Sequence, residues 1–291
     1  MSGRAPTKSL GAAARAVSRT LPLLLVALLL LVALLAPACG DDATSPDDTG
    51  SPGGTASPSS ADAVKILQDA AAKMSTDGLT MHLAFGTQLV FDGPTQSNTV
   101  TATGSGDMEM PTALRYVVDV TADDSGGALE VVTVDGVDYY TRDANDTEQP
   151  WSVSDSPMAV PFDLGKEIER YLGMATQTEV VKTSVENGQQ MQLIRVTMGP
   201  LEYARGRTEI DMEATFAQTF GLSAEESEKA LGKGLAFAEF KVGEDDGYVH
   251  DLTERWLVRL EGGNGFLQEV AIAFSRFGKP IDPPIVEPKT D

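Results

Sequence analysis

Cysteine is nearly absent from this sequence of 291 residues, which contains only Cys39. A single cysteine excludes any disulfide within one chain, so the fold must be stable without that covalent link. Histidine is almost as scarce, with His82 in a predicted strand and His250 in a polar loop. Nothing in their spacing indicates that the two histidines share a site.

Basic residues are also few, with 22 lysines and arginines against 43 aspartates and glutamates and a net charge of −21. Four of the basic residues precede position 38, so removal of that leader would leave 18 basic and 43 acidic residues, a net charge of −25. Such a surface repels phosphate backbones and anionic lipid head groups. Nucleic acid is therefore excluded as a partner, and residence at a membrane requires an anchor other than a basic surface.

Catalytic motifs are missing as well. The sequence has no G-x-S-x-G elbow, no H-E-x-x-H and no G-x-x-x-x-G-K-[ST] loop. Asp143, Asn145 and Thr147 have the spacing of the first calcium ligands of an EF-hand, but Glu148 stands where that loop requires glycine and Ser154 where it requires an acid. We therefore expect neither enzymatic activity nor a bound metal.

A long apolar run is present in one place, from Leu21 to Ala36. As a helix it would be roughly 24 Å long, shorter than the ~30 Å hydrocarbon core that a spanning helix must cross. Basic residues and no acidic ones precede it, which is typical of an export signal. Residues 1–38 are therefore predicted to be a signal peptide.

Small residues, Ala36-Pro37-Ala38, come directly before Cys39. The segment resembles the signal of a bacterial lipoprotein, in which cleavage leaves a diacylglyceryl cysteine as the first residue. This resemblance implies a covalent diacylglyceryl and acyl anchor on Cys39, no other cofactor, and localisation on the extracytoplasmic face of the cell membrane. Two or more acyl chains, at ~0.8 kcal/mol per buried methylene, hold a protein on a membrane almost permanently. The alternative is an ordinary signal peptide cut after Ala38, because Ala36 stands where lipoprotein signals usually have leucine.

Residues 39–61 are predicted to be the lipidated cysteine followed by a flexible linker. The linker consists mainly of Gly, Ser, Thr, Pro and Asp, so it has almost nothing to bury. A coil of this length has an r.m.s. reach of roughly 25 Å, which suits a tether. The remaining residues 62–291 are enough for one large domain with its own core.

The domain is predicted to begin with an amphipathic helix capped by Ser59 or Ser60, with an apolar face at helical spacing formed by Val64, Leu67, Ala71 and Met74. Alternating apolar residues then predict a strand over 79–91 and another over 114–120. Between these, residues 98–110 are expected to form a strand with a bulge or bend at Gly104 and Gly106.

Asp135-Gly136 and Asn187-Gly188 are each expected at a hairpin turn, because these dipeptides tolerate positive φ angles. A helix is predicted over 162–173, with Leu164, Ile168 and Leu172 on one face and Gly173 at its end. Further expectations are a strand over 206–216, a short helix capped by Ser223 and Glu226, and three final strands over 235–242, 255–262 and 267–277.

Strands outnumber helices about three to one and most connections are short, so we expect the α+β class with a large antiparallel sheet. A sheet of about ten strands curls, and its apolar face must be covered. The few helices are the only candidates for that cover.

This layout resembles the LppX/LprAFG lipoproteins of mycobacteria and related actinobacteria, which are similar in fold to the LolA and LolB carriers. The resemblance covers most of residues 62–291. It depends on the lipid-attachment cysteine, the helix ending in AAAKM, the VDGVDYY hairpin, the FDLGKEIERYLG helix and the closing FSRFGKPIDPP. It implies a curved antiparallel half-barrel with helices covering its concave face, and an apolar cavity that holds the acyl chains of a lipid or lipoglycan. A membrane-anchored carrier of this kind could have an envelope transporter as partner.

The candidate lipid-binding residues come from the alternating faces of two predicted strands and from one helix: Met81, Leu83, Phe85, Leu114, Tyr116, Val118, Leu164, Ile168 and Leu172. Flexible methionines, ten in the whole chain, suit an adaptable apolar surface. The same residues would look no different if they only filled a core. An alternative function is therefore an envelope sensor or protein-docking domain of the same fold that carries no lipid.

Overall fold

The computed structural model describes residues 59–93, 97–111, 113–122, 125–134, 138–146, 148–153, 163–206, 212–260 and 264–289. Its helices are α2 (Ser60–Met74), α3 (Leu164–Gly173), α4 (Pro200–Arg205), α5 (Met212–Phe220) and α6 (Ala224–Leu231). Its strands are β1 (Thr80–Asp92), β2 (Ser97–Glu109), β3 (Ala113–Ala122), β4 (Ser125–Val134), β5 (Asp138–Asp143), β6 (Ser152–Val153), β7 (Ala175–Glu186), β8 (Gln189–Met198), β9 (Leu235–Gly243), β10 (Val249–Arg259) and β11 (Gly265–Ser275).

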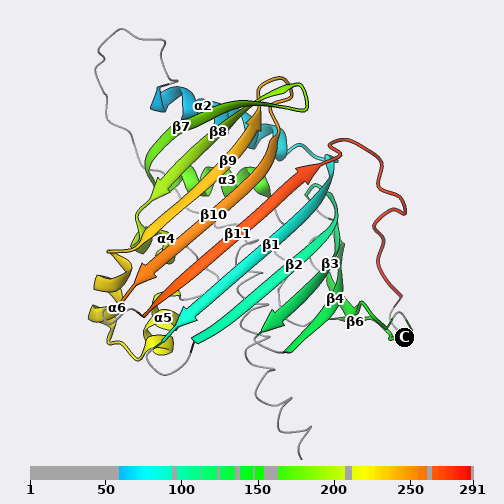
Figure 1. Ribbon diagram of the computed structural model, residues 1–291. Coiled ribbons are helices and arrows are strands. Elements are labelled where there is room, and N and C mark those ends of the chain that lie inside the picture. The colour runs from blue at the N-terminus through cyan, green and yellow to red at the C-terminus, as the bar shows by residue number, and fades with distance from the viewer. Residues whose placement is uncertain are drawn as a thin grey trace, which may run out of the picture.

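All these strands belong to one open, eleven-stranded antiparallel sheet with the order β6-β5-β4-β3-β2-β1-β11-β10-β9-β8-β7. Figure 1 shows the sheet curving around α3, which lies behind β9 and β10, while α4, α5 and α6 gather at one end of the strands. The predicted α+β class, with a large curved antiparallel half-barrel and helices on its concave side, is confirmed.

The first and last strands lie side by side in the middle of the sheet (Figure 1, cyan beside red). β1 pairs with β11 along its length, from His82 opposite Ser275 to Asp92 opposite Gly265. The sheet is therefore two meanders, β1–β6 and β7–β11, joined by strands from opposite ends of the domain.

The two edge strands, β6 and β7, are poor templates for pairing with another chain. β6 has only two residues, and the pairing of β7 with β8 is interrupted between Ala175 and Gln177 and again between Val180 and Lys182. Short and bulged edges of this kind hinder edge-to-edge association.

The predicted first helix is confirmed as α2. The Ser59 side chain accepts a hydrogen bond from the Asp62 backbone N–H, and the Asp62 carboxylate accepts one from the Ser59 backbone, which completes a capping box. The buried face of the helix packs on α3 and β7 and consists of Ala63, Leu67, Ala70, Ala71 and Met74. Val64 is only half-buried.

The Asn187-Gly188 hairpin is confirmed, with φ angles of 52° and 84° at the turn between β7 and β8. Both positive angles agree with the turn type that this dipeptide favours. The Asp135-Gly136 turn lies outside the described residues, but the strands predicted on either side of it, β4 and β5, do pair.

The strand predicted over 206–216 is wrong, because residues from Met212 onward form the helix α5. Phe216 and Phe220, one turn apart, face the β1–β11 seam, where their rings lie 6.4 Å from Phe266 and 6.4 Å from Phe91 respectively. Tertiary packing of this aromatic pair favours the helix over the alternating pattern. The sequence reading also missed α4, which begins with Pro200 in its first turn.

The bulge expected in β2 is also wrong. β2 pairs with β1 and β3 without a break in register. A Cβ atom at Gly104 would lie 2.9 Å from a ring carbon of Phe85, and one at Gly106 would lie 2.5 Å from Cβ of Tyr116. Gly104 therefore lies against the Phe85 ring and the β3 backbone, and Gly106 lies against the backbone and Cβ of Tyr116.

Replacing Gly106→Ala should lower the free energy of unfolding by about 1–3 kcal/mol, because the new methyl group would overlap Tyr116 and the backbone of β3. The matched control is Gly127→Ala in β4, where an added Cβ meets nothing within 4 Å. That control should change stability by less than about 0.5 kcal/mol. Urea unfolding of both variants measures the difference, and equal effects would contradict this explanation of the glycines.

Candidate functional site

The inner face of the sheet, defined as the face on which the helices pack, is apolar over β1 and β3. Met81, Leu83, Tyr116 and Val118 are buried there. The pairing register sets Tyr116 beside Leu83 and Val118 beside Phe85, with only a β2 glycine between the members of each pair. The structure thus brings together six predicted residues on one surface: Met81, Leu83, Phe85, Leu114, Tyr116 and Val118.

Aromatic side chains fill the space above the β2 glycines. The rings of Phe85 and Tyr116 meet edge to face with their centroids 5.7 Å apart. Phe85 remains half-buried, whereas Tyr116 is 3% exposed. The glycines therefore let β1 and β3 present a joined surface across the strand that separates them.

Helix α3 lies on the other half of the inner face, against β7 and β8. Leu164 and Ile168 are fully buried, as predicted. Leu172 is only half-buried and lines an open pocket of about 850 Å³ between α2, α3 and β7. Tyr171 occupies the buried position that the sequence analysis assigned to Leu172. The helix ends at Gly173, as predicted, and Met174 is its C-cap.

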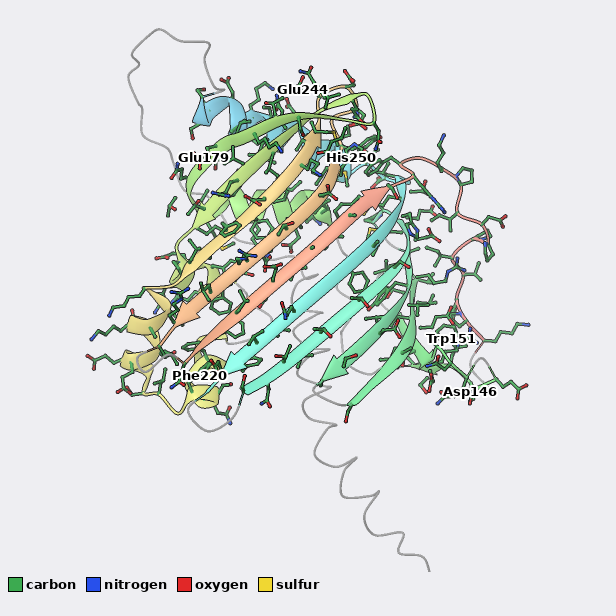
Figure 2. The ribbon with its side chains drawn as sticks, viewed as in Figure 1. Asp146, Trp151, Glu179, Phe220, Glu244 and His250 are labelled. Carbon is green, nitrogen blue, oxygen red and sulfur yellow. The ribbon has the colours of Figure 1, made fainter. Side chains whose placement is uncertain are left out.

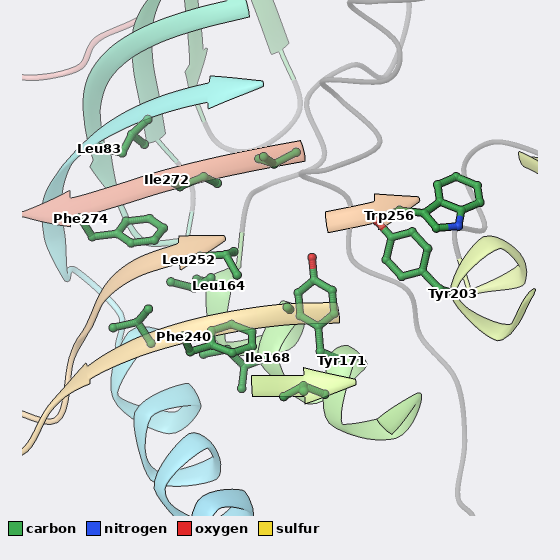
Figure 3. Close-up of a cluster of buried hydrophobic side chains, with 14 of the residues drawn as sticks. Leu83, Leu164, Ile168, Tyr171, Tyr203, Phe240, Leu252, Trp256, Ile272 and Phe274 are labelled. Atoms are coloured by element: carbon green, nitrogen blue, oxygen red, sulfur yellow. The ribbon is translucent and has the colours of Figure 1, made fainter. Parts of the chain in front are cut away.

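Several inner-face residues of β10 and β11 were missing from the predicted site. Leu252, Ile272 and Phe274 are buried beside Leu83 and Phe85 in the sheet register. Figure 3 shows Leu83, Ile272 and Phe274 on the sheet in one cluster with Leu164 of α3. The alternation in residues 266–274 could have identified the β11 members, but only if β11 were known to lie beside β1.

A polar cluster interrupts this apolar face. Glu254 of β10 is 1% exposed, and its carboxylate accepts hydrogen bonds from the hydroxyl groups of Tyr171 in α3 and Tyr203 in α4. The amide of Gln268 in β11 donates a third, of 3.1 Å, to Glu254 Oε1. A buried carboxylate is tolerated only when hydrogen bonds or charges compensate it, and here the compensation ties two helices to the sheet.

Tyr203→Phe should lower the free energy of unfolding by about 1.5–3 kcal/mol, since it removes a hydrogen bond to a buried charged group. Tyr248→Phe is the matched control, because the structure gives the Tyr248 hydroxyl no hydrogen bond within the described residues. The control should shift stability by less than about 0.5 kcal/mol. Chemical denaturation of the two variants would reject the role of the Glu254 cluster if both lost the same stability.

Three further polar atoms are buried on the inner face. Within the described residues, Thr87 Oγ1 on β1, Thr133 Oγ1 on β4 and Trp256 Nε1 on β10 have no hydrogen-bond partner. The Trp256 ring is itself held between Tyr203 and Phe266, at centroid distances of 5.3 and 4.9 Å. An unsatisfied buried donor costs about 1–3 kcal/mol.

The outer face of the sheet is polar by contrast. Lys241 Nζ lies 2.7 Å from an Asp251 carboxylate oxygen and 3.1 Å from one of Glu186. Hydrogen bonding to Asp251 outweighs partial burial and, together with Glu186, raises the pKa of Lys241 above its ordinary value. The two faces therefore differ in chemistry, and the apolar residues concentrate on the inner one.

Neither histidine lies at a site shared with the other. His82 Nδ1 lies 2.9 Å from Asp107, and His250 Nε2 lies 2.9 Å from Asp246. Asp143 belongs to the series with calcium-like spacing. Its side chain accepts a 2.8 Å hydrogen bond from the Asn145 backbone N–H, as in an Asx turn. Among the described residues, no group of three or more potential metal ligands comes together.

Cys39, the predicted signal peptide of residues 1–38 and most of the linker lie outside the described residues. Anchoring through Cys39 therefore stays a prediction. In the part of the chain that the structure does describe, no helix is both long and apolar enough to cross a membrane.

No protein-family model matches the chain, and no curated protein matches it either. Several solved structures are similar to the chain. LprF from Mycobacterium bovis is 15% identical with a TM-score of 0.41, and the match covers 80% of this chain and 99% of that one. LppX from Mycobacterium tuberculosis is 13% identical with a TM-score of 0.38, covering 77% and 98%. A LolA superfamily protein from Nitrosomonas europaea is 8% identical with a TM-score of 0.23, covering 77% and 97%.

At such low identities and TM-scores, what those proteins bind remains a property of those proteins.

Proposed function

We propose that this protein is an exported lipoprotein, anchored to the cell membrane through acyl chains on Cys39, that binds a lipid or lipoglycan against the inner face of its sheet. It carries or presents this amphiphile at the cell envelope. The acyl chains of the ligand contact the surface formed by β1, β3 and β11, and no chemical step on the ligand is part of the function.

The main support for this proposal is that the apolar inner face spans more strands than the helices chiefly contact. Buried apolar side chains occur on every strand from β4, with Val131, to β8, with Ile194, and the Glu254 cluster on β10 and β11 interrupts them. Within the described ranges, α2, α3, α4 and α6 contact β7–β10, and α5 reaches Phe91 and Phe266 with its rings. Since the helices contact chiefly β7–β10, we infer that the hydrocarbon chain lies against the inner face of β1 and β3.

The polar atoms of the inner face also fit an amphiphile. Lipid esters and hydroxyl groups are hydrogen-bond acceptors, and the buried Trp256 N–H and Thr87 hydroxyl can donate to them. Ligand sites of this kind are mostly apolar with a few polar groups that set orientation. A saturated hydrocarbon with no polar group would leave both donors unsatisfied.

The test compares two neighbouring residues of β3. Val118→Trp puts an indole on the inner face, where Val118 is 0% exposed, whereas Val117→Trp puts it on the outer face, where Val117 is 40% exposed. Overfilling a packed apolar surface costs about 1–3 kcal/mol, so Val118→Trp should weaken lipid binding by about 5-fold or more. Native mass spectrometry of protein purified from its host measures the fraction with bound lipid.

Val117→Trp should keep the lipid content of the unaltered protein. Equal lipid content in the two variants would remove the inner face of β3 from the site. Protein that contains no lipid in any form would favour the alternative, a sensor or docking domain with a filled interior.

A further inference from the structure

A second apolar depression lies at the end of the molecule, away from the inner wall of β1 and β3. It is a pocket of about 370 Å³ formed by the end of α5, one side of α6, and Arg259, Leu260 and Asn264 near the ends of β10 and β11. Its apolar lining consists of Phe220, Leu222, Ala230 and Leu260, all of them half-buried. Its rim carries the side chains of Glu226, Lys229, Lys233, Arg259 and Asn264.

The cations of this rim are exposed and have no acidic partner. Within the described residues, none of Lys229, Lys233 and Arg259 forms an ion pair. The rim carboxylate, Glu226, is held by the backbone and hydroxyl of Ser223 in the cap of α6. Of the other α6 acids, Glu228 lies 3.4 Å from Arg205 and Glu225 is exposed in the first turn.

This arrangement stands out because the chain as a whole has a net charge of −21. The opposite end of the same strands is acidic, with Glu244, Asp245 and Asp246 in the turn between β9 and β10. Figure 2 shows Phe220 at one end of the sheet and Glu244 with His250 at the other. The α5–α6 end, which we call the cationic end, thus combines unpaired positive charge with exposed apolar surface.

We propose that the cationic end docks on the surface of a membrane that contains anionic phospholipids. Lys229, Lys233 and Arg259 would lie among the lipid phosphates, and the half-buried side chains of Phe220, Leu222 and Leu260 would face the acyl boundary. This pairing of basic and apolar side chains is the one that interfacial membrane contacts use. Physiological salt screens repulsion from acidic residues more than about 8 Å away. Of the nearer acids on α6, Glu226 is bound by Ser223 and Glu228 by Arg205.

The exposed cations of this surface favour an anionic membrane over a neutral one as the occupant. Each lysine or arginine close to an anionic bilayer strengthens binding about 5-fold, so removal of two should weaken the contact by an order of magnitude or more. The docking does not depend on whether the inner face holds a ligand, so either proposal can fail without the other.

The experiment reports the local environment of the cationic end in the full chain. Ala224→Cys, an exposed position at the start of α6, receives an environment-sensitive dye, with single labelling confirmed by mass. Val185→Cys, 70% exposed at the far end of β7, receives the same dye as a reference. Each protein is mixed with vesicles of phosphatidylcholine alone or of phosphatidylcholine and phosphatidylglycerol in equal amounts.

The expected result is a blue shift of the α6 dye with phosphatidylglycerol vesicles only, which added salt reverses, and no shift of the β7 dye. Lys229→Gln/Lys233→Gln should abolish it. Lys65→Gln/Lys182→Gln, which removes the same charge from α2 and β7, should retain it, and circular dichroism shows that both pairs fold.

Three results would overturn the proposal. They are an equal shift with phosphatidylcholine, an unchanged shift in the Lys229/Lys233 variant, and the same shift with inorganic phosphate in the absence of vesicles. The last result would indicate a site for soluble anions.

Discussion

The pairing of β1 with β11 is the constraint on which the rest of the structure depends. These strands come from opposite ends of the domain, and their hydrogen bonds convert two separate meanders into one sheet. Only then do Leu83 and Phe85 share a surface with Ile272 and Phe274. With a single cysteine in the sequence, no disulfide within the chain can hold this seam, so backbone hydrogen bonds and apolar burial have to maintain it. Pairing between distant segments is slow to form, because the chain entropy is lost before the contacts are gained.

The Glu254 cluster links α3 and α4 to that surface. A carboxylate in an apolar interior is costly, and three donors from α3, α4 and β11 compensate it. Helices α3 and α4 are thereby tied to β10 and β11. The proposed ligand contacts the inner face of β1 and β3, which carries the Phe85–Tyr116 pair.

Much of the local structure could be predicted from the sequence. The capping boxes at Ser59 and Ser223 fix the starts of α2 and α6, and Asn187-Gly188 fixes a turn, because each depends on interactions within a few residues. Alternation in β1 and β3 also assigned their inner residues correctly. These features need no knowledge of distant neighbours.

The predictions that were wrong or missing concern features that depend on residues distant in the sequence. The sequence of 206–216 alternates enough to suggest a strand, but Phe216 and Phe220 find their partners on β1 and β11 only as a helix. Gly104 and Gly106 suggested a bulge by their residue type. The atoms that explain them belong to β1 and β3, which the local sequence does not place beside them. The Glu254 cluster joins residues from α3, α4, β10 and β11, so no local pattern indicates it.

The central claim is that a lipid lies against the inner face of β1 and β3. Photo-crosslinking with a lipid that carries a diazirine in its acyl chain tests it most directly, with the modified positions mapped by peptide mass. The account predicts adducts on inner-face residues of β1 and β3, such as Leu83 and Tyr116, that an excess of unmodified lipid suppresses. Adducts confined to outer-face residues, or insensitive to that competitor, would contradict it.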